Sequence, residues 1–158
     1  MRTLDKTDTD ILRELSQDPR STFVALADRL GLSRNTVQAR MARLEASGVF
    51  LAFDRRINPS ALGYPLTAFI EVHLQQKKLA AIVAELARIP EIVQAHGMSG
   101  PTDLLVRVVC TDADDLFRID ALILAVDGVE RTATSLAMGE LIPFRIGPLL
   151  EQGSASGS

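Results

Sequence analysis

The stretch TFVALADRLGLSRNTVQARMARLEASGV, residues 22–49, decides the fold of the N-terminal part of this chain. A short helical pattern of apolar residues runs up to Gly31, a residue that readily takes the left-handed conformation found at helix ends. Ser33 follows at the position of an N-cap, where its hydroxyl can accept a backbone N–H of the next turn. The pattern therefore predicts two helices joined by a tight turn.

The second of these helices has two distinct sides. Its inward apolar stripe, spaced by four and then three residues, is Val37, Met41 and Leu44. Near its start, Arg34, Asn35 and Gln38 are left facing outward. Arg can bond guanine edges in a bidentate manner, and Asn or Gln can bond adenine edges. This pattern indicates a helix-turn-helix whose second helix reads double-stranded DNA, although a helical hairpin with merely solvated charges has the same spacing.

Further cations on and after this helix are candidates for DNA phosphate contacts. Arg40 and Arg43 lie along the helix, and Arg56 follows it at a point where a wing could touch the backbone. Together the candidate DNA-binding residues are Ser33, Arg34, Asn35, Thr36, Gln38, Arg40, Arg43 and Arg56.

The charge distribution supports this interpretation. Residues 1–56 hold ten Lys or Arg against eight Asp or Glu, whereas residues 57–158 hold seven against twelve. The net charge of −3 therefore comes from the second part of the chain and does not argue against nucleic-acid binding by the first.

The composition sets the broad class of protein. With 158 residues, 47% of them hydrophobic, the chain can form two small cores. A single cysteine, Cys110, excludes an intrachain disulfide and fits a reducing compartment. No stretch resembles a signal peptide or approaches the ~20 apolar residues that cross a bilayer. We therefore expect a cytoplasmic, nucleoid-associated protein without a membrane partner.

A further helix and a strand are expected to flank the hairpin. Thr7 and Asp10 resemble a capping box, and Pro19 ends the helix that follows. After Gly48, the alternation of Val49, Leu51 and Phe53 predicts a strand. These elements define a DNA-binding domain over residues 1–57, followed by a linker over residues 58–65.

The pattern changes beyond the linker. Strands are expected at Leu66–Leu74, 91–97, Asp103–Cys110 and from Val129 to about Ile142, with helices over Lys77–Ile89 and from Thr111 to near Gly128. This β-α-β-β-α-β order predicts a ferredoxin-like sandwich over residues 66–150, with a disordered tail at 151–158. Leu105 and Val109 would lie on the sheet face without helices, so we expect a homo-oligomer. The fold class is thus α+β.

The order and spacing of several segments resemble the Lrp/AsnC (leucine-responsive regulatory protein) family over most of the chain. The matching segments are LDKTDTDILREL at 4–15, LGLSRNTVQARMARLEASGV at 30–49, RINPSALG at 56–63, SGPTD at 99–103 and DGVERTATSLAM at 127–138. The resemblance implies an N-terminal winged helix-turn-helix. It also implies a transcription regulator that dimerises through its C-terminal sheets, often forms rings of dimers, and responds to a small effector, usually an amino acid.

The resemblance places the effector at the loop Met98–Asp103. Gly100 lets backbone N–H groups approach a carboxylate, Asp103 can pair with an ammonium group, and Ser99 offers a hydroxyl. Pro101 departs from the polar residue common in the family. Asp103 could instead be a turn residue that bonds its own loop. The candidate effector-binding residues are Met98, Ser99, Gly100, Asp103, Ser135, Leu136 and Ala137.

The sequence gives little support for a metal site or a catalytic site. His73, His96 and Cys110 lie on separate expected strands, and Asp112, Asp114 and Asp115 fit the first turn of a helix. We expect no metal, no cofactor and no catalytic site. Two alternatives to a ligand-responsive, sequence-specific regulator stay open: an architectural protein that bends or wraps DNA, and an enzyme like the haem-biosynthetic decarboxylases that share this two-domain fold.

Overall fold

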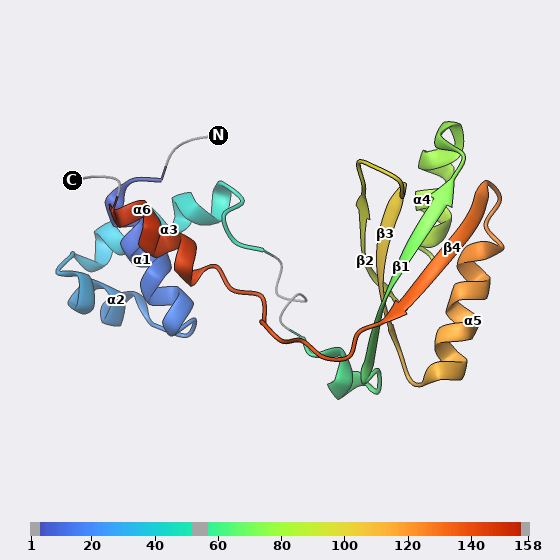
Figure 1. Cartoon of the computed structure of the whole chain (residues 1–158). Coiled ribbons are helices and arrows are strands. Elements are labelled where there is room, and N and C mark those ends of the chain that lie inside the picture. The colour runs from blue at the N-terminus through green and yellow to red at the C-terminus, as the bar shows by residue number, and fades with distance from the viewer. Residues whose placement is uncertain (1–3, 52–56, 156–158) are drawn as a thin grey trace. The chain divides into compact units, whose positions relative to one another are not determined.

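The computed structural model describes residues 4–51 and 57–155, which fold into two compact units (Figure 1). Unit 1 comprises Met1–Arg55 and Ile142–Ser158, and unit 2 comprises Arg56–Leu141. Each unit has a hydrophobic core of its own. The chain therefore passes between the units twice, because its C-terminal segment returns to the first of them.

Unit 1 begins with helix α1, Lys6–Gln17, which starts earlier than the sequence suggested. The capping box is formed by Asp5 and Asp8, and the prediction that Thr7 and Asp10 form it was wrong. The Asp8 backbone N–H donates to the Asp5 carboxylate at 2.9 Å. Both pairs have the required spacing of three residues, so spacing alone does not tell them apart.

The helix-turn-helix pair forms as predicted. Helix α2, Phe23–Leu30, ends at Gly31, whose φ of +64° is the left-handed conformation. Helix α3 follows at Arg34–Ala46. The core of unit 1 joins all three helices through Ile11, Leu26, Ala27, Val37, Met41 and Leu44.

The strand expected after the hairpin is not present in the described part of this segment. Residues 49–51 adopt no strand conformation, and Leu51 is 59% exposed. An isolated strand has no ladder hydrogen bonds to gain, so alternating apolar residues do not suffice to form one. Phe53 and Arg56 lie outside the described residues.

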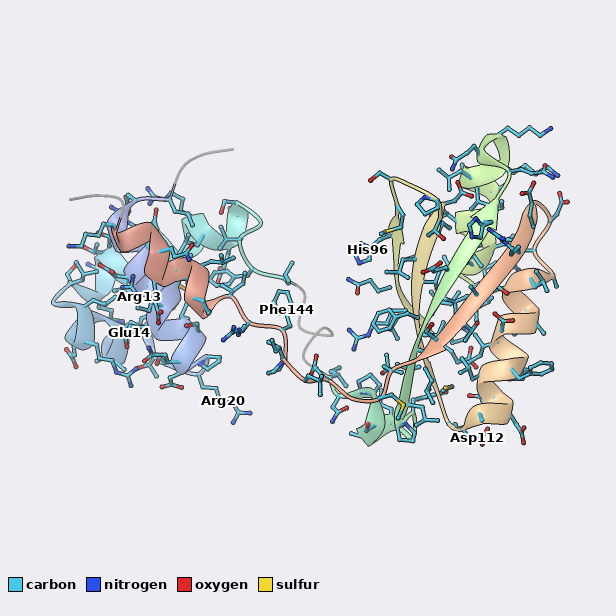
Figure 2. The ribbon with its side chains drawn as sticks, in the orientation of Figure 1. Arg13, Glu14, Arg20, His96, Asp112 and Phe144 are labelled. Atoms are coloured by element: carbon cyan, nitrogen blue, oxygen red, sulfur yellow. The ribbon has the colours of Figure 1, made fainter. Side chains whose placement is uncertain are left out.

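The C-terminal segment differs from the expected domain end at residue 150 and tail at 151–158. Helix α6, Gly147–Ala155, belongs to unit 1 and lies beside α1 (Figure 1). Arg13 of α1, labelled in Figure 2, donates from Nη2 to the Leu150 carbonyl oxygen at 3.1 Å. The small residues of this helix carry little apolar periodicity, so its docking on α1 could not be read from the pattern.

Unit 2 is a four-stranded antiparallel sheet in the order β2-β3-β1-β4 (Figure 1). Its strands are β1 Leu66–Leu74, β2 Ile92–Gly97, β3 Leu104–Cys110 and β4 Val129–Leu136. The short helix η2, Pro59–Leu62, precedes β1, and η3, Gln76–Lys78, leads into α4, Leu79–Leu86. Helix α5, Ala113–Leu124, connects β3 to β4. This is the predicted β-α-β-β-α-β order.

Both α4 and α5 cover one face of the sheet. Their buried residues Ile82, Leu86, Ile119 and Ile123 pack on alternate residues of the central strands β1 and β3. Strand β4 ends at Leu136, not near Ile142 as expected. Leu136 pairs with Ala68 and the Ala137 N–H bonds the Thr67 carbonyl, so β4 ends where β1, its partner, begins.

The opposite face of the sheet is more polar than predicted. Val109 is only 4% exposed within the single chain, so it adds little to an open apolar patch. Phe69 is 39% exposed on this face, and its partner on the adjacent strand β3 is Arg107. A patch of mixed polarity remains, and the homo-oligomer stays a prediction.

Candidate nucleic-acid interface and ligand site

Ser33 and Thr36 fix the start of α3. The Thr36 backbone N–H donates to the Ser33 Oγ at 3.1 Å, and the two hydroxyl oxygens are 2.8 Å apart. This is the N-cap that the sequence predicted. The first turn of α3 is therefore held in place, and the side chains that project from it have a defined direction.

The outward side of α3 carries the predicted base-reading residues. Arg34, Asn35 and Gln38 are exposed, and among the described residues their side chains make no hydrogen bond or ion pair. Ala39 and Ala42 are also exposed on this side, and their small side chains let the helix approach a partner closely. Sequence reasoning missed these two alanines because a residue that only makes room carries no chemical signal.

An open hollow of about 540 Å³ lies against α3. It is lined by Asn35, Thr36, Ala39, Arg40 and Arg43. The spacing of four residues from Thr36 to Arg40 and from Asn35 to Ala39 places them on one continuous stretch of helix surface. Amide, hydroxyl and guanidinium groups thus share one face.

Arg40 and Arg43 are engaged by the acidic start of α1. Arg43 Nη2 donates to both oxygens of Asp8 at 2.8 Å, and Arg40 Nη1 donates to Asp8 Oδ1 at 3.0 Å. Arg40 Nη1 also bonds the Asp5 carboxylate. The two predicted phosphate contacts are therefore also structural ion pairs. Arg56, the third predicted cation, lies outside the described residues.

The electrostatics of this cluster favour charged carboxylates. Burial by itself would raise the pKa of Asp8, but hydrogen bonds from Arg40 and Arg43 outweigh it and the pKa lies below its ordinary value. The hydrogen bond from Arg40 likewise lowers the pKa of Asp5. Each cation thus has an anion at hydrogen-bond distance, and the cluster carries no net charge.

We expect this cluster to make unit 1 sensitive to acid. A carboxyl whose pKa is lower in the folded state contributes stability above its unfolded pKa and loses it as the pH falls further. The melting temperature of unit 1 should therefore decrease once the pH falls below about 4, the ordinary pKa range of aspartate. In Asp8→Asn the melting temperature should be lower at neutral pH and should fall less on acidification. An equally steep fall in the variant would show that other carboxyls control acid unfolding.

The loop Met98–Asp103 closes the turn between β2 and β3. The Met98 N–H donates to the Asp103 carbonyl oxygen at 2.9 Å, and Gly100 has a φ of +114° that favours glycine. Ser99 and Gly100 are exposed, and no atom of the chain lies within 4 Å of a Cβ built on Gly100. A ligand or another chain can therefore approach this backbone.

Asp103 is bonded within its own unit. Its Oδ2 accepts the Leu74 N–H at 2.9 Å and its Oδ1 accepts the Gln76 side-chain N–H at 2.6 Å. Both bonds lower the pKa of Asp103, and the bond from the Leu74 N–H has the larger effect. The turn role considered as an alternative is thus present. Each oxygen retains a further acceptor position, so the carboxylate can still face a cation.

A polar cluster beside this loop was not anticipated. Thr102 is buried, and its hydroxyl lies 3.3 Å from Glu71 Oε2 and 3.4 Å from His73 Nε2. Arg131 of β4 reaches the same His73 nitrogen at 3.1 Å. These residues come from three separate strands or loops, and only the strand register brings them together.

The other predicted effector residues, Ser135, Leu136 and Ala137, lie at the opposite end of β1. Ser135 pairs with Phe69, whereas Asp103 bonds Val72 and Leu74. Four residues of strand separate these positions by roughly 13 Å. A single chain therefore does not bring the two parts of the predicted effector site together.

The candidate metal ligands are dispersed. Figure 2 shows His96 on β2 and Asp112 at the start of α5, at different ends of unit 2. Asp112 caps α5 by accepting the Asp115 N–H at 2.8 Å. Within the described residues, no group of three or more His, Cys, Asp or Glu could hold a metal ion.

No helix among the described residues combines the length and apolar character needed to span a membrane.

Comparison with known proteins assigns both units. The winged helix-turn-helix DNA-binding family matches residues 4–50, and the Lrp/AsnC ligand binding domain matches residues 67–146. The HTH-type transcriptional regulator FL11 of Pyrococcus horikoshii is 32% identical over 135 residues, which cover 85% of this chain and 89% of that protein.

Solved structures agree over almost the full length. Escherichia coli AsnC superposes with a TM-score of 0.84 at 25% identity, covering 93% of this chain and 100% of AsnC. A transcriptional regulator of Neisseria meningitidis, solved as a complex with L-Met, gives a TM-score of 0.78 at 30% identity and covers 89% of this chain and 93% of that one. The chain therefore belongs to the Lrp/AsnC family, as a DNA-binding transcriptional regulator with a ligand-binding domain and not an enzyme.

Proposed function

We propose that this regulator binds specific double-stranded DNA sequences through the outward side of α3. The observation that carries the proposal is the set of exposed, unengaged side chains at the start of that helix, Arg34, Asn35 and Gln38. These residue types bond base edges in the major groove, which admits an α-helix. A protein with this role acts on the DNA of the nucleoid, in the cytoplasm.

We further propose that the effector is an amino acid bound near the loop Met98–Asp103. The L-Met complex of the Neisseria relative supports this ligand class. The exposed backbone at Gly100 can accommodate a carboxylate, and the free acceptor positions of Asp103 can face an ammonium group. Each end of an amino acid would then have a partner of opposite charge.

The effector site is completed between copies of the chain. Ser135, Leu136 and Ala137 lie too far from Asp103 within one chain to touch the same small ligand. A homodimer formed through the open face of the sheet, and a ring of such dimers, would bring different copies of these segments together. Effector binding would thereby be coupled to assembly.

DNA of random sequence tests the first proposal against the architectural alternative. A sequence-specific regulator should bind its selected site typically 10³-fold or more tightly than random DNA at physiological salt. Sites enriched from a random pool, followed by fluorescence anisotropy on both DNAs, supply the measurement. Equal affinity for the two would support DNA bending or wrapping with little sequence preference.

Thermal-shift measurements with each standard amino acid test the second proposal. A ligand at about a hundred times its dissociation constant adds roughly 2.7 kcal/mol if it binds only the folded state. We expect one chemical class of amino acid to raise the melting temperature of unit 2. A screen in which no amino acid has an effect would contradict this ligand class.

Replacing Asp103 separates its two roles. Asp103→Asn keeps the side-chain shape but removes the charge, so we expect effector affinity to fall roughly tenfold to a hundredfold. Asp127→Asn is the matched control, because Asp127 is an exposed carboxylate of the same unit that pairs with Lys78 at 2.8 Å. A lower melting temperature with unchanged effector affinity would leave Asp103 only its turn role.

A further inference from the structure

The acidic start of α1 and the cations of α3 form a charge cluster that extends to the proposed DNA-binding surface. Asp5 and Asp8 lie on one side, and Arg40 and Arg43 lie on the other. The same two arginines line the hollow against α3 together with Asn35. The cluster is therefore at the edge of the surface proposed to contact DNA.

The two acids differ in accessibility. The Asp8 side chain is 6% exposed and holds Arg43 by two hydrogen bonds to one nitrogen, so it is anchored in the unit. The Asp5 side chain is 50% exposed and pairs with Arg40, whose side chain is 26% exposed. An ion pair in contact with water contributes little to stability, so a competing anion can open it at low cost.

We propose that Asp5 restrains DNA binding, because its carboxylate competes with DNA phosphate for the guanidinium of Arg40. The inference rests on the proposed function, in which the outward side of α3 contacts DNA. When phosphate binds Arg40, the Asp5 carboxylate keeps its bond from the Asp8 N–H at 2.9 Å and its longer ion pair with Arg43 at 3.8 Å. Asp8 keeps its bonds to Arg43 and holds α1 against α3. The DNA affinity of the regulator is thus set below the value that its cations alone would give.

Asp5→Asn tests this directly. Asn is as good an N-cap as Asp, so the start of α1 is preserved while the charge is removed. We expect affinity for both selected and random DNA to rise roughly twofold to fivefold, the range that corresponds to an exposed ion pair. The slope of log affinity against log salt should steepen by up to about 0.9, the value for one further phosphate contact.

Asp28→Asn is the matched control. Asp28 is exposed on α2 and has no ion pair or side-chain hydrogen bond among the described residues, so this variant changes the net charge equally. Its affinity and salt slope should stay closer to wild type. Equal gains in the two variants would overturn the proposal, because they would reflect net charge alone.

The double variant Asp5→Asn/Arg40→Gln completes the test. If Asp5 acts through Arg40, the gain from Asp5→Asn should disappear when Arg40→Gln is already present. A gain that persists without Arg40 would overturn the inference. The melting temperature of each variant shows whether it is folded. If Asp5→Asn does not fold, Asp5→Ser takes its place, because Ser is also a good N-cap.

Failure of the proposed function gives a different result. If substitutions at Arg34, Asn35 and Gln38 leave DNA binding unchanged, α3 is not the contact surface and the proposed function fails. If those substitutions weaken binding while Asp5→Asn behaves like Asp28→Asn, only the restraint by Asp5 is overturned.

Discussion

Ile11→Ala should lower the free energy of unfolding of unit 1 by about 2–5 kcal/mol, the cost of a large-to-small change in a packed core. Ile11 is fully buried and packs α1 against the helix-turn-helix pair. The core of unit 1 holds few other large buried residues, so we expect DNA binding to be lost with its fold. Hydrogen exchange read by mass spectrometry resolves the two units and is the suitable measurement.

Unit 2 should keep its protection in the Ile11→Ala variant, because its core is separate. Ile70→Ala is the matched control, since Ile70 is fully buried in the centre of β1. It should destabilise unit 2 by a similar amount and leave α1, α2 and α3 protected. If either substitution exposed the amides of both units equally, the two units would unfold as one cooperative body.

The helix-turn-helix could be predicted because its determinants are local. Gly31 ends α2, and Ser33 begins α3 three residues before the N–H that it accepts. The inward stripe depends only on helical periodicity, and its residues Val37, Met41 and Leu44 are buried as expected. Each of these features is determined by residues that lie within two helical turns of one another.

The ion pairs of α3 could not be predicted in the same way. Arg40 and Arg43 lie 35 residues from their partners Asp5 and Asp8, respectively, and from sequence alone they were assigned to phosphates. A cation on a helix surface is consistent with solvent, phosphate or a distant carboxylate. Only the packing of α1 against α3 distinguishes these partners.

In unit 2, too, the features set by local sequence could be predicted and those set by distant contacts could not. The period of two along β1 predicted its bounds, Leu66–Leu74, correctly. The end of β4 depends on where its neighbour begins, and the docking of α6 depends on the surface of α1, so neither could be read locally. The separation of Ser135 from Asp103 is likewise a consequence of strand register. Resemblance grouped these residues in one site, and the fold of one chain divides them.

Arg34→Ala, Asn35→Ala and Gln38→Ala should each weaken binding to the selected DNA site by about 1–3 kcal/mol, the value of one good contact to a base edge. For Asn35→Ala and Gln38→Ala, binding to random DNA should change less, because these side chains are uncharged and contribute little to phosphate attraction. Each variant should also relax the preference at one base position. Binding curves on the site and on single-base variants of it provide the measurement.

Arg20→Ala serves as the control for Arg34→Ala, because it removes the same charge from an exposed residue outside α3 (Figure 2). It should lower the affinity for selected and random DNA by the same small factor. The salt slope separates the effects further: Arg34→Ala should change it by less than about 0.9 if its main contact is a base. Equal losses on selected and random DNA for all three substitutions would show that the start of α3 contacts only the DNA backbone.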